Sequence, residues 1–363
     1  MSVPKERVPH ERRVALVPDS VARLVKGGAA VVVERGAGTA ALASDDAYAA
    51  AGAALADDAA GACADADVVV KVQRPLPDEV ALLPEGATLV CLLGQGGPDA
   101  DAVVRALAGR RVTTLALERV PRITRAQSMD VLSSQSTVAG YKAALLGAAA
   151  LGRLLPMLTT AAGSLAPARA FVLGAGVAGL QAIATARRLG AVVSAFDVRL
   201  AAAEQVKSLG ATFVAAETLA TDAETKGGYA RAQTDEERAR TMAAVGAHLA
   251  TVDLAITTAL VPGRPAPRLI TAEMVAAMKP GAVIVDLAAE SGGNCALTRA
   301  GETVVTPNGV TVLGPVNLPS TVPVHASQMF SKNVLTLLEH LTKDGTLDVD
   351  PSDEIAGAMI VKA

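Results

Sequence analysis

Short apolar runs and stretches of helical spacing alternate along the whole chain. In the first third, runs typical of strands cover 29–34, 68–72, 88–93 and 113–116, and helices are predicted between them at 18–26, 44–51 and 99–108. Each helix begins near a Pro, Ser or Asp, and glycines at 27, 28, 52 and 109 mark helix ends. Because strands and helices alternate, this part of the chain predicts a parallel sheet in a doubly wound unit.

The alternation continues beyond a long predicted helix at 134–155. Further strands are predicted at 170–173, 191–196, 212–215, 254–257, 283–286 and 311–313, and an amphipathic helix at 330–341 is expected to return to the first domain. The polar region 217–240 interrupts this pattern and contains Gly227-Gly228-Tyr229. It is either a solvated insertion with a charged helix at 235–240 or a mobile lid that carries one aromatic residue.

The most specific local pattern is the glycine-rich turn that follows the apolar run 170–173. Gly174 permits a tight strand-to-helix turn, Gly176 lets a pyrophosphate approach the backbone, and Gly179 lets the next helix pack closely on the strand. The start of that helix offers N–H groups to phosphates. The turn therefore predicts a dinucleotide site, with an incidental glycine turn as the alternative. Its candidate residues are Gly174, Ala175, Gly176, Val177, Ala178 and Gly179.

A second apolar run ends at Asp197, 18 residues after the last glycine of the turn. The Asp197 carboxylate can accept hydrogen bonds from the adenosine ribose hydroxyls and disfavours a 2′-phosphate, so NAD(H) is expected rather than NADP(H). Arg199 is the counter-argument, because arginine often accommodates a 2′-phosphate. We give Asp197 precedence because it occupies the strand end itself, and we include Val198 in the predicted site.

A chain of 363 residues is long for one hydrophobic core, so two domains are expected. We expect an α/β protein of two doubly wound, Rossmann-like domains with a nucleotide cleft between them. The first domain is predicted to be discontinuous and to comprise residues 1–132 plus 323–363. The second, residues 133–322, is predicted to bind NAD(H).

Composition and charge argue against several classes of function. The net charge of −3, without a block of Lys or Arg, gives no electrostatic footprint for nucleic acid. The three cysteines are odd in number and widely spaced, and the four histidines lack metal-ligand spacing. No signal peptide is recognisable, and no apolar run approaches the ~20 residues of a membrane helix. We therefore expect a soluble, cytosolic protein with reduced, buried thiols and no metal site.

Polar side chains that could carry chemistry gather in three places: Arg13 with Lys71, the segment 122–136, and the segment 286–294. The segment 122–136 is the densest, and Ser133 or Ser134 is expected to be the N-cap of the long helix. No pair of nucleophile and base stands out in it. This composition suits hydride transfer, in which the cofactor supplies the chemistry and the protein supplies orientation and electrostatics.

At these motifs the chain resembles the NAD(H)-binding alpha subunits of proton-translocating nicotinamide nucleotide transhydrogenases. The resemblance covers nearly the whole chain, and its most specific part is Arg125-Ala-Gln-Ser-Met-Asp130. The matching segments are 4–7, 71–75, 125–136, 174–179, 227–230, 256–260 and 286–294. The resemblance implies a two-domain fold shared with alanine dehydrogenase, and direct hydride transfer from NADH to NADP+.

The resemblance also implies partners and a location. It implies a homodimer in which the apolar, proline-bounded segment 156–167 reaches across to the second copy. It implies docking on an NADP(H)-binding beta subunit (domain III), with a small membrane-spanning subunit in the same complex, because the chain stops before any membrane helix. The protein is then cytoplasmic and peripheral on the inner membrane through these partners.

Residue roles follow from the resemblance position by position. The family's nicotinamide-end loop falls on Arg122, Gln127 and Asp130, with Ser133 beside it. The mobile-loop aromatic falls on Tyr229 and the ribose acid on Asp197. The matching segment 256–260 adds Thr258, Ala259 and Leu260 to the expected cofactor-binding residues.

Two other functions compete with transhydrogenation. Alanine dehydrogenase has the same fold, and its substrate arginine and lysine match Arg13 and Lys71, but its acid–base histidine falls on Gly94 and its aspartate on Glu290. Without the histidine, amine oxidation lacks its proton acceptor, so Arg13 and Lys71 are expected to be structural. The other competitor is a non-enzymatic NAD(H) sensor, against which the polarity of the 122–130 loop argues.

Overall fold

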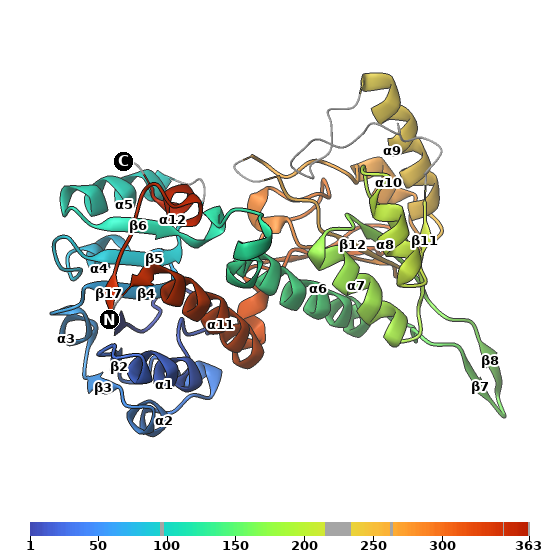
Figure 1. The fold of residues 1–363 in the computed structure, drawn as a ribbon. Helices are drawn as coiled ribbons and strands as arrows, with labels where there is room; N and C mark the ends of the chain where they lie inside the picture. Colours follow the sequence, from blue (N-terminus) through green and yellow to red (C-terminus); the bar gives the residue numbers. More distant parts are fainter. Residues whose placement is uncertain (95–97, 215–233, 262–263, 344, 362–363) are drawn as a thin grey trace. The chain divides into compact units, whose positions relative to one another are not determined.

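The computed structural model describes residues 1–94, 98–214, 234–261, 264–343 and 345–361. The chain divides into two compact units, Met1–Gln135 with Pro319–Ala363, and Ser136–Leu318. Both units are α/β structures built on a largely parallel sheet, as predicted (Figure 1).

The first unit contains a six-stranded sheet in which every pairing is parallel. In spatial order the strands are β3 (Ala54–Ala56), β2 (Val32–Glu34), β1 (Ser2–Val3), β4 (Val68–Gln73), β5 (Thr88–Leu92) and β6 (Thr113–Ala116). The order reverses between β1 and β4, which is the switch point of a doubly wound sheet. The two-residue β1 and the three-residue β3 were not predicted, because neither is long enough to form a pattern.

Helices cover both faces of this sheet. Along β4, Val68, Val70 and Val72 pack into one core and Val69 into another, because successive side chains point to opposite faces. The first core is covered by α1 (Pro18–Lys26), α2 (Asp45–Ala50), α11 (Pro323–Leu341) and α12 (Glu354–Met359), and the second by α3 (Ala59–Cys63), α4 (Pro77–Val80) and α5 (Pro98–Gly109). Burial on both faces explains why β4 is nearly continuous in apolar residues.

The second unit contains a seven-stranded sheet with the same reversal of order. In spatial order the strands are β11 (Thr212–Phe213), β10 (Val192–Phe196), β9 (Arg169–Leu173), β12 (Leu254–Thr257), β13 (Val283–Asp286), β15 (Thr311–Leu313) and the antiparallel β14 (Thr303–Val305). The switch point lies between β9 and β12. One face packs on α6 (Val131–Ala150), α7 (Val177–Arg188) and α8 (Ala202–Ser208), and the other on α9 (Asp235–Leu249) and α10 (Ala272–Ala276).

Three predicted helix boundaries were wrong. The long helix α6 begins three residues earlier and ends five residues earlier than 134–155, because 151–157 forms bends and irregular chain. Helix α9 extends well beyond the charged stretch 235–240, and α11 begins at Pro323, a residue suited to a first helical position. Gly227-Gly228-Tyr229, the predicted lid, lies outside the described residues.

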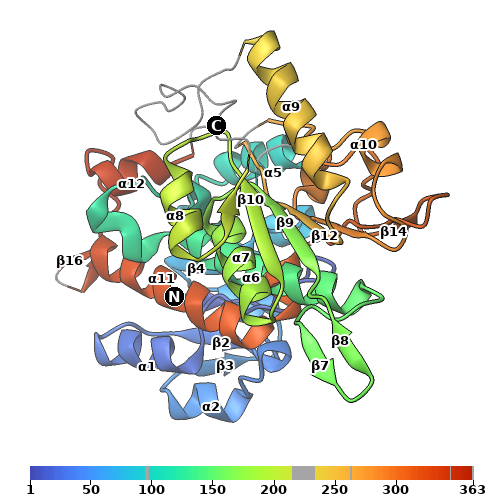
Figure 2. The same ribbon diagram turned by 90° about the vertical axis from the view of Figure 1, so that its right-hand side faces the viewer.

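A β-hairpin of β7 (Leu158–Thr160) and β8 (Gly163–Leu165) extends from the second unit beyond the start of β9 (Figure 2). Every residue of its two strands is exposed. Its base is held by the buried Asp253, whose carboxylate pairs with Arg153 at 3.1 Å and accepts the Arg169 N–H at 2.8 Å. The hairpin is therefore an outward arm with a fixed base.

Within the described part of the chain, no helix is both long and apolar enough to cross a membrane.

Candidate functional site

The glycine turn after β9 has the geometry that its three glycines predict. Gly174 has φ +103°, in the region that favours glycine. A Cβ on Gly179 would lie 1.8 Å from the Gly174 carbonyl oxygen, so only glycine allows this packing. A Cβ on Gly176 would have no heavy atom of the described chain within 4 Å of it, so the backbone there borders open space. The turn thus combines a strained bend, a tight contact and an open backbone, as a bound pyrophosphate requires.

Helix α7 begins directly at this turn, with Gly176 as its N-cap residue. Because glycine supplies no capping side chain, the first N–H groups of α7 receive no capping bond from the N-cap. Val177 is 43% exposed, so the start of the helix is accessible to solvent. The helix start can therefore offer N–H groups to an anion.

Asp197 follows β10, the strand beside β9, and its carboxylate reaches the glycine turn. Its Oδ2 accepts the Ala175 N–H at 2.8 Å, and its Oδ1 accepts the Arg199 N–H at 2.8 Å. The Arg199 side chain also pairs with it through Nε at 2.9 Å and Nη2 at 3.0 Å. The sequence placed both residues at the strand end, but as rivals for cofactor selection. In the structure they form an ion pair, with Asp197 only 6% exposed.

The loop after β12 meets the same turn from the other side of the switch point. The Thr258 hydroxyl donates to the Gly174 carbonyl oxygen at 3.0 Å. Ala259 is held by the buried side chain of Asn294, which accepts the Ala259 N–H at 3.0 Å and donates to its carbonyl at 2.9 Å. Leu260 is 53% exposed. Sequence reasoning did not find the role of Asn294, because its partner lies 35 residues away in the chain.

The predicted polar segment 286–294 supports this loop. The buried Asp286 accepts hydrogen bonds from the hydroxyls of Thr257 and Thr298, at 2.8 and 2.6 Å. It also accepts the N–H groups of Ala288 and Cys295, at 3.0 and 2.9 Å. Four donors fill the lone pairs of a carboxylate. Asp286 therefore fixes the fold of the loops after β12 and β13.

The segment 122–136 belongs to the first unit, where residues 124–129 form a 3₁₀ helix. Arg122 and Gln127 are exposed, whereas Ala126 and Met129 are buried. The segment is anchored where Arg125 pairs with Glu354 at 3.1 Å. The buried residues and this ion pair hold the loop, and its two long polar side chains reach solvent.

The predicted N-cap at Ser133 or Ser134 is wrong. Helix α6 begins at Val131, and Asp130 caps it, because its Oδ1 accepts the Ser133 N–H at 2.9 Å. The Ser133 hydroxyl donates to Asp130 Oδ2 at 2.6 Å. Ser133 is thus a donor in the first turn, and it forms a hydrogen-bonded pair with Asp130.

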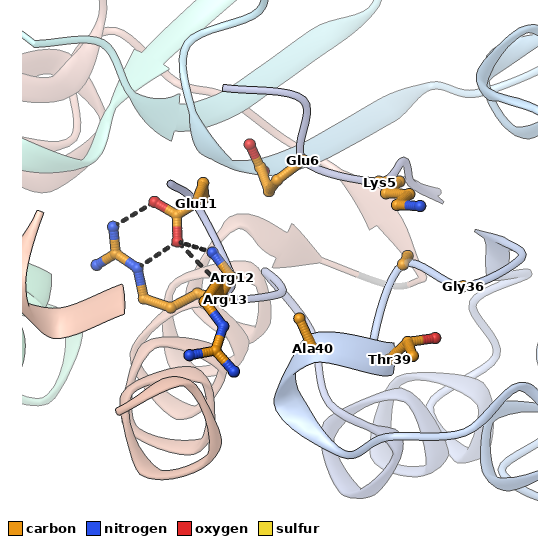
Figure 3. A pocket seen from close by; sticks show the side chains of 9 residues that line it. Lys5, Glu6, Glu11, Arg12, Arg13, Gly36, Thr39 and Ala40 are labelled. Atoms are coloured by element: carbon orange, nitrogen blue, oxygen red, sulfur yellow. Dashed lines mark hydrogen bonds and ion pairs between the residues drawn. The ribbon is translucent and has the colours of Figure 1, made fainter. Parts of the chain in front are cut away.

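Arg13 lines a pocket of about 290 Å³ at the carboxyl end of the first sheet (Figure 3). Its guanidinium pairs with Glu11 through Nε at 2.8 Å and Nη2 at 2.7 Å, and its Nη1 donates to Gln135 at 2.8 Å. Burial opposes ionisation of Glu11, but the hydrogen bonds and charge of Arg13 prevail and lower its pKa to about 2. Arg13 is therefore neutralised within its own unit.

Lys71 is also paired within the first unit. Its Nζ lies 3.0 Å from Glu79 Oε1 and 3.7 Å from Glu6 Oε2, and all three side chains are buried. Burial raises the pKa of Glu6 to about 7, even though the charge of Lys71 acts against that shift. These contacts agree with the structural role expected for Arg13 and Lys71. Gly94, at the position expected for the histidine of alanine dehydrogenase, has φ +71° and donates its N–H to Glu118.

Tyr229, the predicted aromatic of the mobile loop, lies outside the described residues. All three cysteines are buried and form no disulfide. Among the residues that the structure describes, no three His, Cys, Asp or Glu side chains gather as a metal site would require.

Comparison with known proteins gives matches over the whole chain. The model of the alanine dehydrogenase/PNT N-terminal domain matches residues 2–139, and that of the C-terminal domain matches residues 143–363. The first portion of the NAD(P) transhydrogenase alpha subunit of Rhodospirillum rubrum, a separate chain, is 52% identical over 371 residues, which cover 100% of this chain and 96% of that protein. The crystal structure of transhydrogenase from Sinorhizobium meliloti has a TM-score of 0.88 at 45% identity, over 99% of this chain and 96% of that one. An alanine dehydrogenase of Halomonas elongata is 33% identical, over 95% of this chain and 88% of that protein.

The chain belongs to the alanine dehydrogenase/PNT family. Within that family it stands with the NAD(P) transhydrogenase alpha subunits, to which it is closer than to the alanine dehydrogenases. It is an NAD(P) transhydrogenase subunit, and its likeness to the first portion of a divided alpha subunit implies a complex with further subunits.

Proposed function

We propose that residues 133–322 form the NAD(H)-binding domain of a proton-translocating transhydrogenase, and that residues 1–132 with 323–363 form the family's N-terminal domain. The observation that carries this proposal is the glycine turn, whose open backbone at Gly176 lies beside the buried carboxylate of Asp197. In this proposal the nucleotide supplies the hydride. The chain binds it, orients it and excludes water from it.

The pyrophosphate is proposed to lie against the turn from Gly174 to Gly179 and the start of α7, and the adenosine ribose against Asp197. Val198 and Arg199 continue that edge, and Thr258, Ala259 and Leu260 form the opposite one. The bonds from Thr258 to Gly174, and from Asn294 to Ala259, support this arrangement because they fix both edges before a ligand arrives. Tyr229 is proposed to close over the nucleotide.

We further propose that Arg122, Gln127, Asp130 and Ser133 serve the nicotinamide end. Gln127 is exposed and has both a donor and an acceptor for a carboxamide. Asp130 and Ser133 bond to each other at the start of α6, so their part is to hold this loop in place. Arg122 supplies a positive charge near Asp130 in the sequence.

The acceptor in this proposal is NADP+ held by a partner, the NADP(H)-binding beta subunit (domain III), and a small membrane-spanning subunit couples transfer to proton movement. The chain itself is proposed to be a homodimer, cytoplasmic and peripheral on the inner membrane through these partners. The exposed hairpin arm supports the homodimer, because Met157 and Leu165 are 68% and 55% exposed. Direct transfer then requires the two nicotinamide rings in near-contact, with reacting carbons ~3–3.5 Å apart.

Substitution of Asp197 tests the nucleotide assignment. Asp197→Ala is expected to weaken NADH binding by about 1–3 kcal/mol, because hydrogen bonds to a charged acceptor are lost. A fluorescence titration of NADH against the wild-type and variant proteins measures this loss. Equal affinities in two folded proteins would contradict the assignment of Asp197 to the ribose.

A further inference from the structure

The Asp197 carboxylate has no lone pair left for a ligand in this structure. Oδ1 accepts from the Arg199 N–H and Nε, and Oδ2 accepts from the Ala175 N–H and Arg199 Nη2, at 2.8 to 3.0 Å. A carboxylate offers about four lone-pair sites, and all four are taken. A ribose diol can bond to it only after one of these donors has left.

Of the donors, only the Arg199 guanidinium can leave without moving the backbone. The Ala175 N–H belongs to the glycine turn, which is fixed by the φ of Gly174 and by the Thr258 bond. The Arg199 N–H belongs to the chain directly after β10. The Arg199 side chain, in contrast, is 27% exposed, so it has a path to solvent.

We propose that Arg199 is an internal competitor of the adenosine ribose: its guanidinium occupies the ribose-binding face of Asp197 and must withdraw when NAD(H) binds. This inference rests on the proposed assignment of Asp197 and extends it. A guanidinium and a ribose diol are both hydrogen-bond donors, so they compete for the same acceptor. Arg199 therefore weakens NADH binding and speeds NADH release.

A nucleotide with a 2′-phosphate meets a different situation. A phosphate accepts hydrogen bonds, so the guanidinium of Arg199 is a partner for it rather than a competitor. Arg199 thus affects NADH and NADPH in opposite directions, and it narrows the preference for NADH that Asp197 sets. It is a specificity-determining residue that acts through its pairing with Asp197.

The test compares Arg199→Met and Arg199→Lys with wild type, by fluorescence titration of NADH and NADPH. Arg199→Met is expected to bind NADH about 2- to 5-fold more tightly, in line with the small strength of partly exposed ion pairs. It is expected not to bind NADPH more tightly. Arg199→Lys should lie between wild type and Arg199→Met, because a lysine keeps the charge but cannot occupy both oxygens at once.

Arg188→Met is the matched control. Arg188 is exposed at the opposite end of α7 from the glycine turn, and the substitution removes the same charge. Its NADH affinity should equal that of wild type. If Arg199→Met is folded and binds NADH no more tightly than wild type, or if it binds NADH and NADPH more tightly by equal factors, the proposal is wrong. Should Arg199→Met not fold, Arg199→Lys decides on the same NADH criterion.

Asp197→Asn separates this proposal from the assignment on which it rests. If Asp197→Asn leaves NADH binding unchanged, the ribose assignment itself fails. If it weakens binding, the double variant Asp197→Asn/Arg199→Met should match it, because Arg199 then has no carboxylate to block. A further gain in NADH affinity in the double variant would show that Arg199 acts elsewhere.

Discussion

At the scale of single residues, Gly176 and Gly179 make different demands on the same turn. Gly179 packs against the Gly174 carbonyl, whereas Gly176 borders open space and has an ordinary backbone conformation. The structure therefore separates a glycine needed for the fold from one needed for the ligand, although the sequence motif contains both.

Paired substitutions test this separation. Gly179→Ala is expected to lower the free energy of unfolding by about 1–3 kcal/mol, because its Cβ would overlap the Gly174 oxygen. Gly176→Ala should leave the thermal unfolding temperature nearly unchanged but weaken NADH binding, because its methyl group occupies the space proposed for the pyrophosphate. Calorimetry and NADH titration on both variants measure the two effects. A Gly176→Ala variant with full NADH affinity would count against the placement of the pyrophosphate.

Two buried carboxylates of the first unit titrate in opposite directions. Burial, partly offset by the charge of Lys71, raises the pKa of Glu6 to about 7. In Glu11 the effect of burial is outweighed by Arg13, and the pKa falls to about 2. Between their unfolded values and these folded values, Glu6 binds more protons in the folded state and Glu11 binds fewer. Stability is therefore gained by Glu11 as the pH rises above 2, and lost by Glu6 as it rises from about 4.5 to 7.

Glu6→Gln should remove the loss between about pH 4.5 and 7, so that its free energy of unfolding varies less with pH in this range than that of wild type. Denaturant unfolding at a series of pH values measures this. Glu11→Gln is the matched control, and it should change the pH dependence at lower pH instead. An unaltered slope in Glu6→Gln would mean that Glu6 does not carry this pH dependence.

At the scale of elements, the hairpin of β7 and β8 is the most exposed part of the described second unit. Its base is fixed by Asp253, and each residue of its strands faces solvent. Such an apolar arm is costly for an isolated copy, and a twofold-related copy can cover it.

Met157→Ser together with Leu165→Ser is expected to weaken the proposed homodimer, since it removes apolar surface from the arm without touching its base. Sedimentation at micromolar concentration should show a dimer for wild type and a shift toward monomer for the variant. Val305→Ser, on the 67% exposed Val305 of β14, is the control and should stay dimeric. A wild-type chain that sediments as a monomer would overturn this view of the arm.

The elements predicted best were those whose pattern is local. Helix α1 and strands β6, β12, β13 and β15 agree with their predicted ranges, because each combines an apolar run or amphipathic spacing with a clear boundary residue. The start of α6 was misplaced because Asp130 and Ser133 are both good N-cap residues, and only the structure shows which of them accepts the bond.

At the scale of the whole molecule, the sequence indicated the two α/β units and the motif of the glycine turn. It could not indicate which polar residues pair with one another. Arg199 with Asp197, Lys71 with Glu6, and Asn294 with Ala259 are contacts that form only when distant or alternative partners meet in the folded chain. For this reason residue types were easier to predict than their roles.

The central claim is that this chain presents NADH for direct hydride transfer to NADP+ on a partner. The most direct measurement is stopped-flow hydride transfer from NADH to an NADP+ analogue, with this chain reconstituted with an NADP(H)-binding domain. Wild type should transfer hydride, and Gln127→Asn should do so much more slowly while binding NADH with nearly unchanged affinity, as expected for an interaction made mainly in the transition state. No transfer by wild type, or equal losses of NADH affinity and transfer rate in Gln127→Asn, would contradict this claim.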